Sequence, residues 1–294
     1  MILESINNLV ENEIKISTKK KYVAIIGRNP SKGARSPKLW NAAFKKHKID
    51  MLMYPLDVKK ENLNKLIKKL DDDINFLGGS VAVPYKEDIF KILRKKIDRI
   101  SNKIGSVNCL YRDKKTKKIF GFNTDGYGAL ECLKDNISNL QKRNIIIFGL
   151  GGAGKSVVAV LENYVKKKII VYVRNLNKHK NYSRNFKFIL KKFPIEIDDL
   201  ESCDVLINTT TVGSLDNNKT IINEGLVKKL KKDCFVFDII YQPLKTELIN
   251  ISKKSNLKTV NGIFMNLEQA VIAFHKTISF IKNKKITRLA MSNE

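Results

Sequence analysis

The chain has 294 residues, 43% of them hydrophobic, and a formal net charge of +27 from 56 lysines and arginines against 29 acidic residues. This length supports one large or two modest α/β domains, each with a buried core. The first twenty residues carry three glutamates and no long apolar run, which argues against a signal peptide. No apolar stretch approaches the roughly 20 residues that a membrane-spanning helix needs. We therefore expect a cytoplasmic protein that does not enter a membrane.

The lysine excess has two interpretations. Lysines that neutralise phosphates drive binding to nucleic acids, but here they are scattered in short groups along the chain, without aromatic residues placed among them to stack on bases. We therefore interpret them as solvated surface charge and expect no nucleic-acid partner. A general positive field would still attract an anionic cofactor or substrate.

The cysteines and histidines indicate no metal site. The four cysteines are widely separated and form no C-x-x-C pair, which is typical of buried thiols in a reducing compartment. The three histidines lie in lysine-rich or helical surroundings without metal-ligand spacing. We expect no bound metal.

Alternating strand and helix patterns run through most of the chain. In the first half they predict, in order, a buried strand at 23–26, a helix beginning at Pro37, a strand at 51–54, a helix over 63–70, a break at Gly78-Gly79 and a strand at 81–83. In the second half they predict a strand at 145–148, a helix through 157–161, strands at 169–173, 205–207 and 236–239, and a last helix with apolar residues from Leu267 to Ile278. This rhythm predicts parallel sheets covered by helices, with a domain boundary near residues 121–125.

A glycine-rich turn, Gly149-Leu-Gly-Gly-Ala-Gly154, lies between a predicted strand and a predicted helix. Such glycines let a pyrophosphate approach the amides at the helix N-terminus, as in dinucleotide-binding domains. Read with Lys155 and Ser156, the same stretch also satisfies the P-loop pattern of nucleoside triphosphate-binding proteins. A P-loop-like nucleotide-binding protein is therefore an alternative.

The end of the following strand favours the dinucleotide. A domain that binds NAD has an acidic residue there for the ribose hydroxyl, whereas this chain has Arg174 and Lys178. Cations at this position suit the 2′-phosphate of NADP, so we expect NADP as the cofactor. Asp238, which follows another apolar strand, fits the acidic residue that a P-loop protein needs for its metal.

Several separated segments resemble the shikimate dehydrogenase family, in the same order and with matching spacing. They cover nearly everything from residue 21 to 280 and are Arg35-Ser36-Pro37 with Asn41, Val81 to Lys86, Ile104 to Asn108, Gly121 to Asp125, the glycine turn, the Arg174 region, Asn208-Thr209-Thr210, Asp238 to Pro243, and Gly262 to Met265 with Gln269.

The resemblance implies an α/β fold of two domains and an NADP-dependent oxidoreductase that acts on a CH–OH group. A substrate-binding domain would span 1–122, with a C-terminal helix over 264–294 packing back on it, and a Rossmann-type NADP-binding domain would span 123–263. The implied catalytic pair is Lys86 and Asp125, in which the lysine transfers the proton and the carboxylate orients it. The implied substrate-binding residues are Ser36, Ser80, Asn108, Tyr241 and Gln269. The implied cofactor-binding residues are Gly149, Gly151, Gly152, Ala153, Arg174, Asn175, Lys178, Thr209, Gly262 and Met265.

Departures from the family pattern cluster among the substrate-binding segments. Where the family usually has histidine and Ser-x-Ser-Pro, this chain has Gly33, Ala34 and Ser36; in the family's Asn-Val-Thr segment it has Ser80 and Ala82. Each lost hydrogen bond to a charged group costs about 1.5–3 kcal/mol. The resemblance implies reduction of 3-dehydroshikimate to shikimate, in aromatic amino-acid biosynthesis, by a monomer or homodimer. Quinate or another small hydroxylated substrate is the alternative.

Overall fold

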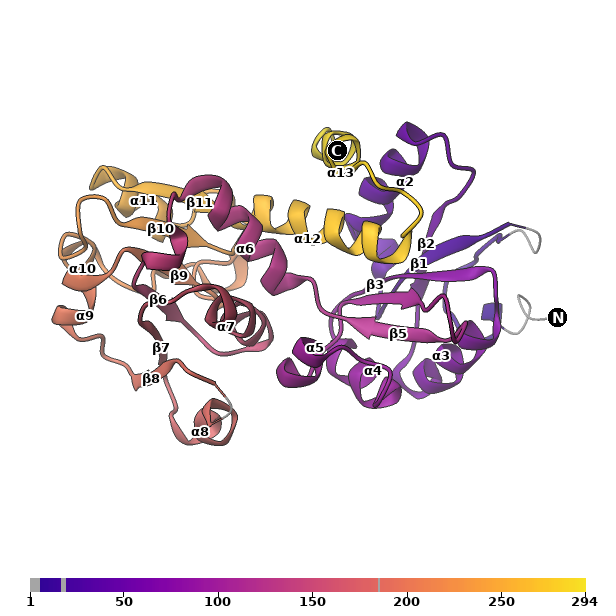
Figure 1. Ribbon diagram of the computed structural model, residues 1–294, viewed down its shortest axis with the longest axis horizontal. Helices are drawn as coiled ribbons and strands as arrows, with labels where there is room; N and C mark the ends of the chain where they lie inside the picture. Colours follow the sequence, from indigo (N-terminus) through magenta and orange to yellow (C-terminus); the bar gives the residue numbers. More distant parts are fainter. Residues whose placement is uncertain (1–5, 17–19, 185) are drawn as a thin grey trace. The chain divides into compact units, whose positions relative to one another are not determined.

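The computed structural model describes residues 6–16, 20–184 and 186–294. The predicted first domain also includes residues 1–5 and 17–19, which lie outside the described residues. The chain divides into two compact units, which we call the first unit (Met1–Thr124 with Gln269–Glu294) and the second unit (Asp125–Glu268) (Figure 1). No helix among the described residues is both long and apolar enough to cross a membrane.

The first unit is built on a five-stranded sheet in the order β2-β1-β3-β4-β5. Its elements are β1 (Tyr22–Gly27), α2 (Ser36–Lys46), β2 (Met53–Asp57), α3 (Leu63–Asp72), β3 (Phe76–Val81), α4 (Lys86–Leu93), α5 (Arg99–Ile104), β4 (Cys109–Arg112), β5 (Ile119–Phe122) and α13 (Lys284–Ser292). The first three strands are parallel, and β4 and β5 join them in antiparallel pairing. Consequently the carboxyl ends of β1, β3 and β5 and the amino end of β4 meet at one edge of the sheet.

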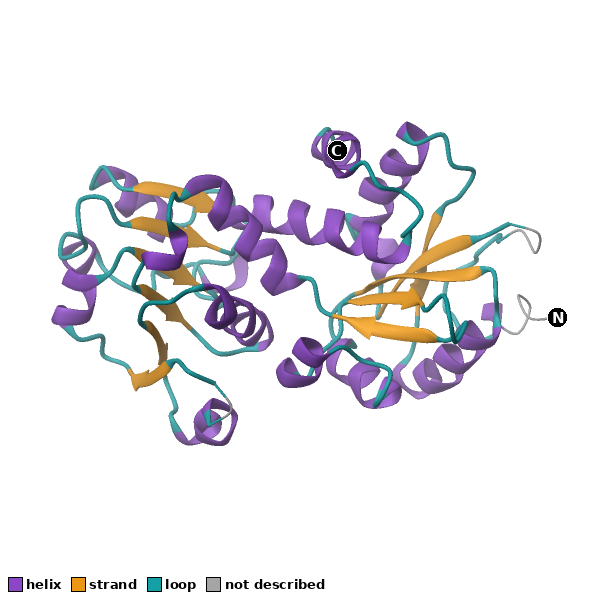
Figure 2. Cartoon of the chain, in the orientation of Figure 1, coloured by secondary structure: helices purple, strands orange, loops and turns teal. Residues whose placement is uncertain are grey.

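Helices cover both faces of this sheet (Figure 2). Helix α3 buries leucine and isoleucine at 63, 66, 67 and 70, a spacing that places them on one helical face against the sheet. On the other face Trp40 of α2 packs against Phe274 of α12 (Gly262–Thr277), with ring centroids 5.2 Å apart. Helix α13 packs on α2.

The second unit has six parallel strands in the order β11-β10-β9-β6-β7-β8. Its elements are α6 (Asp125–Asn136), β6 (Ile145–Phe148), α7 (Gly152–Tyr164), β7 (Ile169–Val173), α8 (Asn177–Ser183), β8 (Ile189–Lys192), α9 (Ile197–Ser202), β9 (Val205–Asn208), α10 (Glu224–Val227), β10 (Phe235–Asp238), α11 (Glu247–Lys254) and β11 (Lys258–Asn261). This order is that of a doubly wound dinucleotide-binding sheet, and the winding reverses between β6 and β9. The predicted α/β class with a Rossmann-type unit is confirmed.

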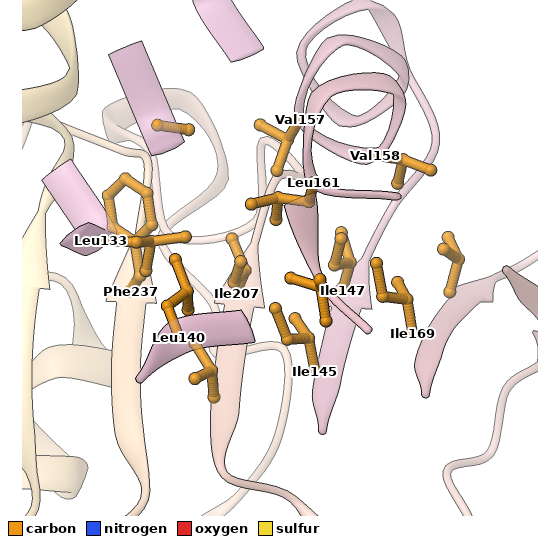
Figure 3. Packing of buried hydrophobic residues seen from close by; sticks show 14 of the residues in the cluster. Leu133, Leu140, Ile145, Ile147, Val157, Val158, Leu161, Ile169, Ile207 and Phe237 are labelled. Carbon is orange, nitrogen blue, oxygen red and sulfur yellow. The ribbon is translucent and has the colours of Figure 1, made fainter. Parts of the chain in front are cut away.

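Alternation along β6 divides its side chains between two cores. Ile145 and Ile147 pack under α6 and α7, beside Leu133 and Leu161 (Figure 3). Ile146 and Phe148 enter the opposite core, which α9, α10 and α11 cover. Strands buried on both faces have continuous apolar runs, which is why the four inner strands β10, β9, β6 and β7 were predictable. The edge strands β8 and β11 are largely exposed or half-buried and were not predicted.

Several predicted elements differ from the structure. The strand predicted at 51–54 is β2, which spans Met53–Asp57. The strand predicted at 81–83 ends at Val81, and its paired part begins at Phe76. Gly78 and Gly79, predicted as a break, lie inside β3 with φ of +130° and +138°, where an added Cβ would meet a neighbouring backbone oxygen. The helix predicted over 264–294 is two helices, because the Asn283 side chain accepts the Ile286 amide and starts α13.

Candidate functional site

The glycine turn lies at the point where the second sheet reverses its winding. Gly149 has φ of +90°, a conformation that favours glycine, and its amide donates to the Tyr172 carbonyl at 2.9 Å. Thr209, just past β9, donates from its hydroxyl to the carbonyl oxygens of Phe148 (2.7 Å) and Gly149 (3.1 Å). The two strands that flank the switch point are thus joined through predicted residues.

The N-terminus of α7 can receive an anion. This helix of 13 residues begins at Gly152, and Gly151 caps it without a side-chain hydrogen bond. The first amides of a helix have no partner within it, and they carry its positive dipole end. An added Cβ at Gly151 or Gly152 would meet no atom within 4 Å. The turn, with Ala153 beyond it, therefore fits a close-lying pyrophosphate.

Cations gather where β7 ends. Arg174 and Asn175 follow β7 and are exposed, and the Lys178 amide donates to Asn175 Oδ1 at 3.3 Å. Among the described residues, neither Arg174 nor Lys178 forms an ion pair with a carboxylate. Parallel β6 and β7 end at the same edge, so these cations lie on the glycine-turn side of the sheet. A phosphate on the ribose of a nucleotide held by the turn fits this position.

The residues that match the P-loop pattern are not placed to bind a nucleoside triphosphate or its metal. Ser156 is fully buried, and its Oγ accepts the Gly126 amide at 2.8 Å. Lys155 directs its ammonium to the Tyr182 ring, 4.8 Å from the centroid. Asp238 is also fully buried, and its carboxylate accepts hydrogen bonds from Thr246, Asn208 and the Ile240 amide.

Burial raises the pKa of the Asp238 carboxyl, although those three donors act in the opposite direction. The side chain therefore anchors the loop after β10 and is enclosed by the protein on all sides. No group of three or more acidic, histidine or cysteine side chains among the described residues is arranged to hold a metal.

The remaining second-unit predictions lie beyond β10 and at the start of α12. The Gly262 amide donates to the Ile240 carbonyl at 3.0 Å, and an added Cβ would stand 1.7 Å from the Ile239 oxygen. Glycine is therefore required for backbone packing at this position. Met265 is 7% exposed and packs into the core beneath α6 and α7. Tyr241 is 38% exposed.

The first unit places its predicted residues on the sheet edge where β1, β3 and β5 end. Ser36 begins α2 after β1, and Lys86 begins α4 after β3; both are half-buried. The Val107 amide donates to the Lys86 carbonyl at 2.9 Å, which fixes the start of α4 beside β4. Ser80 lies within β3, opposite Cys109. Asp125, the predicted partner of Lys86, is the first residue of α6 and of the second unit.

Three buried or half-buried polar side chains from distant segments meet at this edge. Asn108 Nδ2 donates to Thr124 Oγ1 at 3.0 Å, and the Thr124 amide donates to Asn108 Oδ1 at 2.8 Å. Thr124 Oγ1 lies 3.1 Å from Gln269 Oε1. Two predicted residues are thus brought together by Thr124, which the prediction did not include. Its only sequence signal was its place within the Asn-Thr-Asp segment.

The structure gives a reason for one departure from the family pattern. Gly33 ends a short 3-10 helix (Pro30–Lys32) with φ of +122°, and its amide donates to the Pro30 carbonyl. A side chain in this conformation is strained, so the turn excludes the histidine that the family usually has. Ala34 and Ala82 offer no hydrogen-bonding side chain.

A doubly wound sheet, a glycine turn at its switch point and cations at the end of its second strand define a dinucleotide-binding protein with an appended α/β unit. Two family models match the chain: the shikimate dehydrogenase substrate binding domain over residues 25–110, and shikimate / quinate 5-dehydrogenase over 131–263.

Named relatives match over nearly the whole chain. A shikimate dehydrogenase (NADP(+)) of Methanocaldococcus jannaschii is 35% identical, covering 88% of this chain and 92% of its own length. One of Alkaliphilus oremlandii is 32% identical over 93% and 99%. A crystal structure of a shikimate dehydrogenase in complex with NADP+ has 31% identity and a TM-score of 0.80 over 95% of this chain and 97% of that one. This chain belongs to the shikimate dehydrogenase family.

Proposed function

We propose that this chain is an NADP-dependent shikimate dehydrogenase, which reversibly reduces 3-dehydroshikimate to shikimate. The observation that carries the proposal is the polar edge of the first unit. There Lys86 follows β3, Thr124 follows β5, and Asn108 immediately precedes β4. It occurs in a chain whose named relatives are NADP-dependent shikimate dehydrogenases. The first unit would hold the substrate and the second unit the cofactor.

NADPH, when bound, supplies the hydride that reduces the substrate carbonyl carbon. Lys86 donates a proton to the substrate oxygen during reduction and removes it during oxidation, so proton and hydride together account for the two hydrogens gained. Asp125 orients the Lys86 ammonium and accepts a hydrogen bond from a neighbouring substrate hydroxyl. Ser36, Ser80, Asn108, Gln269 and Tyr241 contribute further hydrogen bonds to the substrate.

The cofactor contacts follow from the second unit. The amides of Gly151, Gly152 and Ala153 bind the pyrophosphate, and Gly149 and Thr209 hold the turn in shape. Arg174, Asn175 and Lys178 bind the 2′-phosphate, which makes NADP the preferred cofactor over NAD. The Gly262 backbone and Met265 border the nicotinamide end. We further propose a cytoplasmic location and a monomeric or homodimeric enzyme.

A related substrate is the second candidate. Gly33 and Ala34 replace two polar family residues, and Ser80 and Ala82 replace an amide and a hydroxyl. The positive φ of Gly33 supports this candidate, because the turn favours glycine at that position. Quinate or another small hydroxylated ring would then be the substrate of the same hydride chemistry.

The test follows NADPH formation from NADP with shikimate, and with quinate in parallel. We expect shikimate to be oxidised, and Lys86→Ala to lower kcat at least about a hundredfold, since a positioned acid–base group contributes that much. Lys91→Ala, on the exposed side of the same helix, is the matched control and should retain wild-type rates. Oxidation of quinate alone would favour the second candidate. Wild-type turnover by Lys86→Ala would remove the proposed role of this lysine.

A further inference from the structure

The Thr124 side chain stands between Asn108 and Gln269, two residues to which the proposed function assigns substrate contacts. It is fully buried, so its hydroxyl has no access to water. Its two partners are 16 and 145 residues away in the sequence. Thr124 is the last residue of the first unit before the chain leaves it, and Gln269 is the first residue after the chain returns. The Thr124 hydroxyl therefore joins the position where the chain leaves the first unit to the position where it returns.

The hydrogen bonds determine which way each amide is turned. Asn108 Oδ1 accepts the Thr124 backbone amide at 2.8 Å, so Asn108 Nδ2 faces Thr124 Oγ1 and donates to it. The single hydroxyl hydrogen of Thr124 is then directed to Gln269 Oε1, at 3.1 Å. Its alternative acceptor, Asn108 Oδ1, is farther away at 3.2 Å and already accepts the Thr124 backbone amide.

Gln269 Oε1 receives a second approach from Asn108 Nδ2, at 3.5 Å. The Asn108 Nδ2 group can only donate, so it requires the oxygen of Gln269 on the facing side, and the Thr124 hydroxyl then donates to the same oxygen. Oxygen and nitrogen lie on opposite sides of a carboxamide. The Gln269 nitrogen is therefore turned away from Thr124 and Asn108.

We infer that Thr124 is a positioning residue whose hydroxyl sets Gln269 to present N–H donors to an oxygen of the substrate. The inference rests on the proposed function, in which Gln269 contacts the substrate. Donors from Gln269 match a hydroxyl or carbonyl oxygen that accepts. A reversed amide would present a carbonyl oxygen to the same atom and would reject it unless that atom donated. Thr124 thus acts on substrate specificity through Gln269.

The experiment compares Thr124→Val, which keeps the shape and removes the hydroxyl, with Thr124→Ser, which keeps the hydroxyl. We expect Thr124→Val to raise KM for shikimate about tenfold, the equivalent of one hydrogen bond, with kcat and KM for NADP nearly unchanged. Thr124→Ser should restore most of the affinity. The control is Thr277→Val, which removes a different buried hydroxyl. Thr277 lies on α12, and its hydroxyl donates to the Leu110 carbonyl at 2.9 Å. It should leave KM for shikimate unchanged.

A second measurement does not depend on the substrate. The measurement follows the side-chain amide proton resonances of Asn108 and Gln269 in the ligand-free protein. They are assigned by their loss in Asn108→Asp and Gln269→Glu. We expect both pairs to be resolved, and the Asn108 protons to exchange slowly. In Thr124→Val both pairs should move toward the positions of mobile amides, and Thr124→Ser should restore them. If the wild type fails to oxidise shikimate, the proposed function fails while the resonances still decide the role of Thr124. A Thr124→Val protein with unchanged resonances and unchanged KM would overturn the inference.

Discussion

The two sheets carry their candidate functional residues at the edges where their parallel strands end, but one edge is formed by backbone and the other by side chains. In the second unit the edge is formed mainly by backbone: Gly149 turns the chain, and the first amides of α7 face outward. In the first unit it is formed by side chains, with Asn108, Thr124 and Gln269 bonded to one another. A backbone site is limited by the space available for Cβ atoms. A side-chain site is limited by the pairing of donors and acceptors.

This difference predicts different responses to substitution. Adding a single methyl group at a closely packed glycine of the backbone-built edge should distort it, because neighbouring backbone atoms cannot move aside cheaply. Removing a single hydroxyl from the side-chain-built edge should leave the fold intact and change ligand affinity, as argued for Thr124.

Gly154→Ala should have the largest effect on the second unit. Its Cβ would lie 2.5 Å from the Gly149 carbonyl oxygen and 2.7 Å from Thr209 Oγ1, so the turn must shift. We expect a loss of stability of about 1–3 kcal/mol and a large loss of NADPH binding. Thermal unfolding and NADPH fluorescence titration measure the two effects. Gly152→Ala is the matched control: its Cβ meets nothing within 4 Å, so the melting temperature should be retained. Equal stability of both variants would contradict the steric argument.

Arg174→Ala should have a smaller effect, confined to the cofactor. Loss of one charged hydrogen-bonding partner should raise KM for NADP about tenfold to a hundredfold and leave KM for NAD nearly unchanged. Steady-state kinetics with both cofactors measure this ratio. The control is Arg143→Ala. Arg143 precedes β6, at the opposite edge of the same sheet, and forms an ion pair with Asp233 at 3.5 Å. An equal rise of KM for NADP and for NAD would show that Arg174 does not bind the 2′-phosphate.

The same difference explains what could be predicted from the sequence. The glycine turn and the runs that became β6, β7 and β9 were recognisable, because backbone requirements and double burial leave a local pattern. Strands β4 and β5 were not predicted, since each has only four residues and two of the four are only half-buried. Nor could Thr124 be recognised as a junction, because its partner Gln269 is 145 residues away and only the fold brings them together.

The first unit contains a second network of side chains, and this network includes histidines that can titrate. His47 Nε2 and His275 Nε2 lie 2.8 Å and 2.9 Å from Thr287 Oγ1, and His275 Nδ1 lies 3.1 Å from the Ile281 carbonyl oxygen. That carbonyl accepts only, so Nδ1 carries the hydrogen and neutral Nε2 accepts from the Thr287 hydroxyl. This arrangement, with a neutral His275, joins α2, α12 and α13.

Acidification should therefore weaken the packing of α13, with a smaller effect than either substitution above. Burial lowers the pKa of His275 below its ordinary value, with Lys284, His47 and Lys282 acting in the same direction, and burial also lowers that of His47. The unfolded chain then takes up protons first as the pH falls below about 6.5, so this stability is present above that pH and is lost as the pH falls through the folded-state pKa.

We expect the melting temperature of His275→Gln to fall less than that of the wild type when the pH is lowered from about 7.5 to 5.5, a range that brackets the histidine titration. His179, in the second unit, also has a pKa lowered by burial and by Lys155 and Lys178, so some acid sensitivity should remain. His179→Gln is the matched control, and combining the two substitutions should reduce the sensitivity further. If His275→Gln retained the full acid sensitivity of the wild type, the side-chain network of the first unit would be as insensitive to pH as the backbone edge of the second.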